Sequence, residues 1–228
     1  MDAACVRRWI EVAAARIESE RHYLTHLDAA IGDADHGTNM HRGFSAVLAQ
    51  MTVLAGAGPG DLLTSAGRTF VSIVGGAAGP LYGTAFIQAG QALGDGDAFG
   101  PKRLLEAIRA SLAGVQRLGA AVEGDKTMVD ALAPGLAAFE VGLRGGTLEA
   151  AVRGARAAAM DGMRATIPLQ ARKGRASYLG PRSVGHQDPG ATSSALLFAA
   201  LEDAVLAQRS HQRLAADQPI SLGEIHDR

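Results

Sequence analysis

Apolar residues recur every three to four positions along most of this 228-residue chain, and few stretches alternate between apolar and polar residues. The first spacing places apolar side chains on one face of an α-helix, whereas alternation would indicate a β-strand. The helical spacing extends over residues 3–27, 39–55, 61–74, 81–93, 101–118, 126–143, 148–166 and 191–208. The pattern therefore predicts an all-α protein of about eight helices.

The residues at the ends of these segments support the assignment. Pro101 follows a glycine and stands at an expected first helical turn, and Thr147 stands where it can cap the next helix. No repeat or clear linker interrupts residues 1–208, so we expect a single domain there. Residues 209–228 are polar and predict a C-terminal tail outside that domain.

Composition narrows the classes of function. The formal net charge is -1, which offers no general attraction for nucleic acid or an anionic membrane. The longest apolar runs stop short of the roughly 18 residues that a membrane span needs. The single cysteine, Cys5, has no partner for an internal disulfide and fits a reducing compartment. These features predict a cytoplasmic protein with neither nucleic-acid nor membrane partners.

Three aspartates are crowded into the segment DAAIGDADHGTN, at Asp28, Asp33 and Asp35. Neighbouring carboxylates repel one another, so such a cluster usually has a counter-ion. On a continuous helix Asp28 and Asp35 would share a face and Asp33 would point about 140° away from Asp28, so Gly32 suggests a bend that brings the three together. Oxygen ligands favour a hard cation such as Mg²⁺. The alternative, which the segment alone leaves open, is that Asp33 or Asp35 caps the following helix.

Two further segments could bind phosphate. The segment SIVGGAAGPLYGT, residues 72–84, carries glycines that allow either close approach of a phosphate or close packing of two helices. Residues 171–194 form the longest non-periodic stretch and carry Arg172, Lys173, Arg175 and Arg182, which could hold phosphate or remain solvated. The segment GAAVEGDKT is close to a P-loop, but Asp125 precedes the lysine and a helix precedes the loop, so we reject that assignment.

Taken in order, IGDADHGTNM, GGAAGPLYGT, GDKTM and QARKGRASYLGPRSVGHQDPGATS closely resemble the L subunit of dihydroxyacetone kinases. In bacteria this subunit is the nucleotide-binding partner in the phosphotransferase-dependent enzyme. The resemblance extends over nearly the whole chain. It implies an eight-helix antiparallel barrel that binds a nucleotide at one end. One departure is visible, because the family commonly reads GGASGP and this chain has Ala78 at the serine position.

The resemblance also implies which residues form the site. Asp28, Asp33 and Asp35 would hold two Mg²⁺ ions that bridge to the nucleotide phosphates. The remaining residues that it places around a tightly bound ADP are His36, Thr38, Asn39, Ala77, Ala78, Gly119, Met128, Arg175, Asp188, Pro189 and Gly190. No catalytic residue follows from it, although Arg175 would stabilise charge on the transferring group.

The resemblance implies a reaction with two partner subunits. A phosphohistidine on a carrier subunit (M) would phosphorylate ADP, and the phosphoryl group would then pass to dihydroxyacetone on a K subunit. The chain contains no K-like region, which favours the stand-alone form. Two alternatives remain: an ATP-using L-like subunit for another small ketose, and a nucleotide-binding module that acts on a transcriptional regulator.

Overall fold

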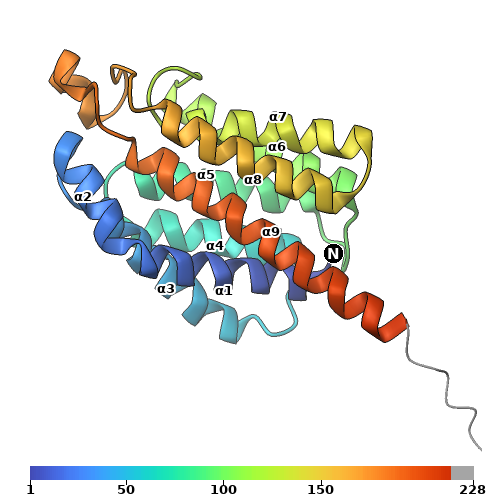
Figure 1. Ribbon diagram of the computed structural model, residues 1–228. Coiled ribbons are helices and arrows are strands. Elements are labelled where there is room, and N and C mark those ends of the chain that lie inside the picture. The colour runs from blue at the N-terminus through green and yellow to red at the C-terminus, as the bar shows by residue number, and fades with distance from the viewer. Residues whose placement is uncertain (217–228) are drawn as a thin grey trace, which may run out of the picture.

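The computed structural model describes residues 1–216 and is all-α over that range, as predicted. Its elements are α1 (Ala3–Ser19), α2 (Arg21–Ile31), α3 (His36–Val53), α4 (Pro59–Ile73), α5 (Ala78–Leu93), α6 (Pro101–Gly119), α7 (Val129–Gly145), α8 (Leu148–Ala165), the 3₁₀ helix η1 (Arg175–Ser183) and α9 (Pro189–Ala216). The longer helices lie side by side, with α9 running between α1 and α8 (Figure 1). Within residues 1–216 the only strand-like pairing is one isolated bridge, between Asp2 and Ala98.

Small residues allow α4 and α5 to pack closely against each other. A Cβ atom at Gly67 would lie 2.5 Å from the carbonyl oxygen of Gly83, and one at Gly90 would lie 2.5 Å from that of Gly60. Gly79 is equally crowded, because its Cβ would lie 2.2 Å from the Val74 carbonyl oxygen. The glycines of the α4–α5 region therefore serve helix packing at Gly79 and Gly83.

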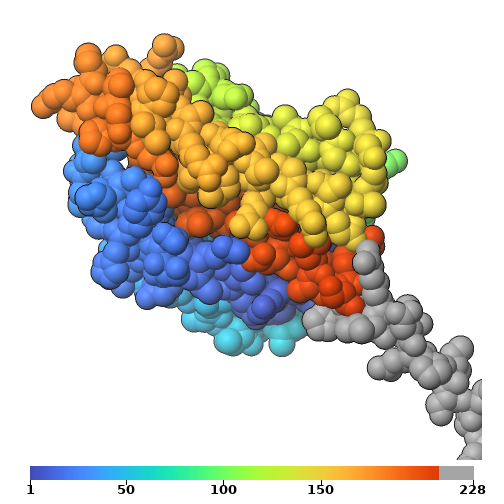
Figure 2. Space-filling model, in the orientation of Figure 1, coloured from blue at the N-terminus to red at the C-terminus, as the bar shows by residue number. Residues whose placement is uncertain are grey.

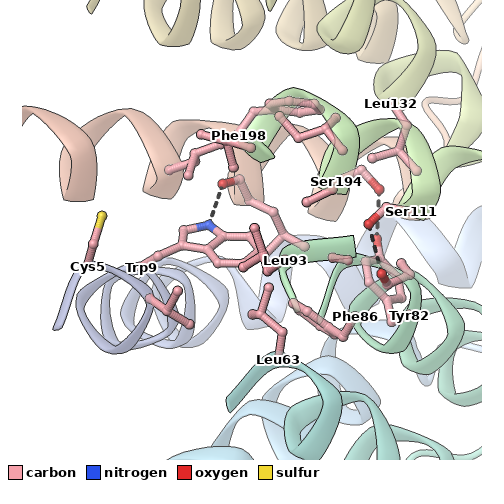
Figure 3. A pocket seen from close by; sticks show the side chains of 18 of the residues that line it. Cys5, Trp9, Leu63, Tyr82, Phe86, Leu93, Ser111, Leu132, Ser194 and Phe198 are labelled. Atoms are coloured by element: carbon pink, nitrogen blue, oxygen red, sulfur yellow. Dashed lines mark hydrogen bonds between the residues drawn. The ribbon is translucent and has the colours of Figure 1, made fainter. Parts of the chain in front are cut away.

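Aromatic side chains fill the centre of the bundle. Phe44 and Phe70 meet edge to face with ring centroids 5.1 Å apart, and Phe86 lies 5.4 Å from Phe70. Beside them lies an apolar cavity of about 100 Å³, where the Trp9 indole N–H donates to the carbonyl oxygen of Leu197 (Figure 3). This core is assembled mainly from the apolar faces that the helical spacing predicts.

Several helix boundaries differ from the sequence expectation. The helix expected over residues 3–27 is two helices, because the chain turns at Glu20 while the apolar spacing continues through the break. The helix expected over residues 126–143 begins only at Val129, since Lys126 has a left-handed backbone conformation (φ +62°) that an α-helix does not accept. The segment 171–194, predicted to be non-periodic, contains η1.

The C-terminal helix is also longer than expected. We predicted that the last helix ends at residue 208, but α9 continues to Ala216 and so includes the first part of the predicted tail. Residues 217–228 lie outside the described residues, and the boundary of a single domain at residue 208 stays a prediction. By length and composition alone, residues 189–210 could cross a membrane, but 61% of the apolar window is buried inside the protein. That burial is typical of a core helix.

Candidate functional site

Five segments that are distant in the sequence surround one cavity of about 290 Å³ at the end of the bundle. They are the turn between α2 and α3, the turn between α4 and α5, the loop before α7, the start of η1 and the start of α9. Figure 2 shows η1 (orange) against α2 (blue) at this end of the molecule. Helix ends and turns therefore supply most of the polar groups that face the cavity.

The three aspartates converge at the edge of this cavity. Asp28 lies in the last turn of α2, Asp33 in the following turn, and Asp35 immediately before α3. One carboxylate oxygen of each lies within 4.8 Å of the others. Ala34 adopts a left-handed conformation (φ 61°), which reverses the chain between Asp33 and Asp35. The bend expected at Gly32 is present, and the resulting cluster has the oxygen ligands that Mg²⁺ prefers.

Asp28 caps α3, which corrects the alternative that Asp33 or Asp35 does so. Its Oδ2 accepts hydrogen bonds from the backbone N–H groups of Asp35 (2.8 Å) and His36 (3.1 Å). The Asp35 side chain makes no capping bond. A Cβ atom at Gly32 would lie 2.0 Å from Asp28 Oδ1, so the glycine is needed for this approach. One carboxylate thus orders the turn that holds the other two.

Arg175, at the start of η1, faces this cluster. Its Nη2 lies 3.0 Å from Asp33 Oδ2, and the two side chains are 65% and 35% exposed. Lys173 also lines the cavity, whereas Arg172 and Arg182 do not. The basic segment therefore places two of its four cations at the cavity and leaves the other two in solvent.

His36 is tied to a buried network of hydroxyl groups. Its Nε2 lies 2.8 Å from Ser193 Oγ, which lies 2.6 Å from the Tyr82 hydroxyl, and that hydroxyl lies 2.9 Å from Ser194 Oγ. Burial lowers the pKa of His36 to about 4 and raises the pKa of Tyr82 to about 12. His36 is therefore neutral at pH 7 and acts as a fixed dipole at the cavity wall.

The start of α9 forms another part of the wall. Asp188 caps this helix, because its Oδ2 accepts a hydrogen bond from the backbone N–H of Ala191 at 2.6 Å. Burial raises the pKa of Asp188 to about 7. Pro189 and Gly190 follow in the first turn and line the cavity. The wall thus carries a carboxyl group whose charge changes near neutral pH.

The turn between α4 and α5 closes the cavity on another side. Gly75, Gly76, Ala77 and Ala78 line it, and Gly76 has a left-handed backbone (φ 64°). Because α5 begins at Ala78, the first N–H groups of that helix have no partner within it. Such N–H groups at a helix N-terminus attract anions. A Cβ atom at Gly75 would have no atom of another segment within 3.4 Å. Gly75 is therefore not required for close helix packing, which fits its position at the cavity.

All the site residues predicted from the sequence line this one cavity except Thr38. Thr38 is exposed on α3, whereas Asn39, which was also predicted, is buried and lines the cavity. The sequence prediction missed several lining residues, and the motif GDKTM was the signal for two of them. The missed residues are Ile31, Gly32, Gly75, Gly76, Leu81, Tyr82, Val115, Ala121, Lys126, Thr127, Val129, Gly174 and Ala176.

An all-α bundle with converging carboxylates and helix N-termini around one cavity has the features of a helical phosphotransferase domain. The chain belongs to the DAK2 domain family, whose model matches residues 30–203.

Curated relatives of similar length narrow the comparison. The chain is 44% identical to the ADP-binding subunit DhaL of the PEP-dependent dihydroxyacetone kinase from Escherichia coli (strain K12), over 81% of this chain and 89% of that one. It is 43% identical to the corresponding subunit of dihydroxyacetone kinase 1 from Listeria innocua, over 85% and 92%.

A solved structure supports the fold. The dihydroxyacetone kinase of C. freundii superimposes with a TM-score of 0.67 at 27% identity, covering 87% of this chain and 34% of that longer chain. A structure of the same kinase in complex with AMP-PNP and Mg²⁺ gives the same TM-score. This chain therefore spans about a third of the solved kinase.

Proposed function

We propose that the chain is the ADP-binding subunit of a phosphotransferase-dependent dihydroxyacetone kinase. In the proposed reaction a phosphoryl group passes from a phosphohistidine carrier subunit to bound ADP and then to dihydroxyacetone on a K subunit. The observation that carries this proposal is the convergence of Asp28, Asp33 and Asp35 within 4.8 Å beside a cavity with free helix N–H groups. Similarity to subunits named as ADP-binding, over nearly their whole length, adds to it.

The carboxylate cluster fits a pair of Mg²⁺ ions. Asp28 keeps Oδ1 free after capping α3 with Oδ2, and Asp33 and Asp35 add oxygens from the turn. Bound Mg²⁺ would neutralise charge on the nucleotide phosphates and on the transferring group. The ion pair between Arg175 and Asp33 supports the placement of positive charge at this turn.

The chain's own groups would bind and orient the nucleotide. Backbone N–H groups at the start of α5 would hold phosphate oxygens, and Ala78 supplies an N–H there without the hydroxyl that a serine would add. Met128 and Gly119 would face the base, and the α9 turn would close the cavity opposite. Arg175, which lines the cavity and is 65% exposed, would stand near the transferring group. In this proposal positioning and charge neutralisation are the chain's contribution, and the acceptor is activated on the partner.

A second candidate is an ATP-using subunit for a different small ketose. Its support is that the chain is also 35% identical to a D-erythrulose kinase and 40% identical to an L-erythrulose 1-kinase, both from Mycolicibacterium smegmatis. Those relatives are longer, because the chain covers only 36% and 31% of them. Comparing dihydroxyacetone with erythrulose in the same reconstituted assay separates the two candidates. A role on a transcriptional regulator stays a prediction, which a pulldown with the purified chain would test.

The proposal is tested by removing the acidic cluster. We expect Asp33→Ala and Asp35→Ala to lose bound nucleotide and Mg²⁺ together while the helical circular dichroism is unchanged. Nucleotide and metal content are measured after desalting. The matched control is Asp161→Ala, since Asp161 is an exposed aspartate that pairs with Arg164 on α8. If both cluster variants keep full nucleotide, the metal proposal is wrong.

A further inference from the structure

Lys126 is a fully buried lysine in the loop between α6 and α7. Its residue exposure is 1%, and its backbone has φ +62°, a conformation that favours glycine. A lysine is rarely buried unless its ammonium group has partners. The burial of this lysine and its backbone conformation are both unfavourable. Its ammonium group is therefore expected to have partners that offset this cost.

The partners of this ammonium are backbone carbonyl groups. Lys126 Nζ donates to the carbonyl oxygens of Thr166 at 2.8 Å and Leu169 at 3.1 Å, and also to that of His186. The carbonyl oxygen of Ile167 lies 3.5 Å away. Within the described part of the chain no carboxylate comes within 4.0 Å of it. Asp188, when it is ionised, and Asp130 favour the charged form of Lys126 from a greater distance.

The carbonyl cage is held in place by bonds that do not involve the lysine. The backbone N–H of Gly185 donates to the Ile167 carbonyl oxygen at 2.8 Å, and that of Asp188 donates to Thr166 Oγ1 at 3.0 Å. Thr166 Oγ1 in turn donates to the Met163 carbonyl oxygen at 2.6 Å. The turn after α8 and the segment before α9 thus keep their carbonyl groups directed at one point.

Several carbonyl oxygens directed at one point are the ligand set that replaces the hydration shell of a monovalent cation. We propose that this cage is a monovalent-cation site occupied by the chain's own ammonium group, and that its occupation holds one wall of the nucleotide cavity together. The next residues, Thr127 and Met128, line that cavity, as do Asp188 and Pro189 just after the cage. The second part of this proposal rests on the proposed function, whereas the cation site itself does not.

Two substitutions at Lys126 distinguish the effect of its charge in the cage from the effect of its side-chain volume. Lys126→Gly vacates the cage and relieves the left-handed backbone, so K⁺ or NH₄⁺ can take the place of the ammonium. Lys126→Met keeps most of the side-chain volume but leaves the carbonyl oxygens without a cation. An exposed lysine at the far end of α6 gives the control, Lys102→Gly.

The experiment compares these variants in choline chloride, KCl and NH₄Cl at one ionic strength. The readouts are the melting temperature without nucleotide and the affinity for fluorescently labelled ADP with Mg²⁺. We expect Lys126→Gly in choline to melt lower and to bind ADP at least about tenfold more weakly than wild type, with both defects reversed by K⁺ or NH₄⁺ in a saturable way. Lys126→Met should show the same defects in every salt, and wild type and Lys102→Gly should not respond to the cation.

The outcomes also distinguish a failure of the cage proposal from a failure of the proposed function. If wild type binds no ADP, the proposed function fails, but the salt dependence of the melting temperature still tests the cage. If Lys126→Gly matches wild type in choline, or gains nothing from K⁺ and NH₄⁺, the cage proposal is overturned. Should Lys126→Gly not accumulate in folded form, it is refolded from urea in the three salts. Recovery only in K⁺ and NH₄⁺ supports the cage, and recovery in none overturns it.

Discussion

Two neighbouring cavities of this bundle are formed by different kinds of structure. The apolar cavity, about 100 Å³, is lined by helix faces and by side chains such as Trp9, Phe86 and Leu93 (Figure 3). The polar cavity, about 290 Å³, is lined mainly by turns and helix ends. Tyr82 and Met128 line both, so only a thin partition separates them. Helix periodicity builds the first cavity, whereas positive-φ turns and helix caps build the second.

The comparison predicts that the largest effect on stability comes from the apolar side. Phe86 lines the apolar cavity and packs against Trp9 and Phe70, so Phe86→Ala should lower the free energy of unfolding by about 3–5 kcal/mol. Urea unfolding measures this. Val53→Ala, at a residue that is 78% exposed, is the control and should change it by less than about 0.5 kcal/mol. A large loss of ADP affinity in folded Phe86→Ala would contradict the separation of the two regions.

The polar cavity should instead contribute to the stability of the protein through the ligands that it binds. Removal of divalent ions with EDTA leaves three converging carboxylates without Mg²⁺, so we expect a lower melting temperature. Adding Mg²⁺ with ADP at about 100 times the dissociation constant should restore about 2.7 kcal/mol. Differential scanning calorimetry measures the shift, and Asp35→Ala should abolish it. An unchanged melting curve would leave capping of α3 as the only role of the cluster.

The fold was largely predictable from the sequence, because apolar spacing reports directly which face of a helix is buried. The spacing could not reveal the break at Glu20, since the apolar face continues across it. The site was predictable only through motifs. The convergence of Asp28, Asp33 and Asp35 depends on a left-handed Ala34, and no pattern predicts that conformation for an alanine.

Other parts of the site could not be found from spacing at all. Lys126 was expected inside a helix, yet its ammonium binds carbonyl groups from residues 40 to 60 positions away. Long-range partners of this kind leave no local signal. The partnership of His36 with Ser193 is equally distant in the sequence, so its buried and neutral state emerges only from the folded chain.

The free energy of unfolding should depend on pH through titratable groups in the wall of the polar cavity, and not through the apolar core. The pKa of Asp188 rises from 3.8 in the unfolded chain to about 7 in the folded chain, so the folded state binds an extra proton between these values. This carboxyl group therefore stabilises the fold at low pH and loses that effect as the pH rises to 7. Between the two pKa values, its contribution to the free energy of unfolding falls by about 1.4 kcal/mol per pH unit. His36, whose pKa is lowered to about 4, contributes with the opposite sign.

The contribution of Asp188 is isolated by a substitution that keeps the cap. Asp188→Asn retains an acceptor for the Ala191 N–H, but it cannot titrate. Urea unfolding in EDTA from pH 4 to pH 7 should show that wild type loses stability relative to Asp188→Asn as the pH rises. Parallel curves for the two proteins would show that Asp188 is ionised throughout this range.

The smallest effect on stability should come from Arg175, because the residue is 65% exposed at the cavity mouth. We expect Arg175→Ala to change the free energy of unfolding by less than about 1 kcal/mol. The rate of phosphoryl transfer should fall by about tenfold or more, since a cation near the transferring group matters most in the transition state. Arg182→Ala is the matched control from the same segment. Equal losses of stability and rate would make Arg175 a structural residue.

The proposed function requires that the polar cavity encloses ADP as a cofactor that is rephosphorylated in place. The direct measurement follows exchange of labelled ADP in the purified chain with a K subunit, supplied with either free ATP or a phosphorylated carrier. We expect that ADP copurifies with the chain, that it exchanges much more slowly than the enzyme turns over, and that dihydroxyacetone phosphorylation is sustained only with the carrier. Rapid exchange together with many turnovers on free ATP would contradict the proposed function and would identify an ordinary ATP-dependent kinase subunit.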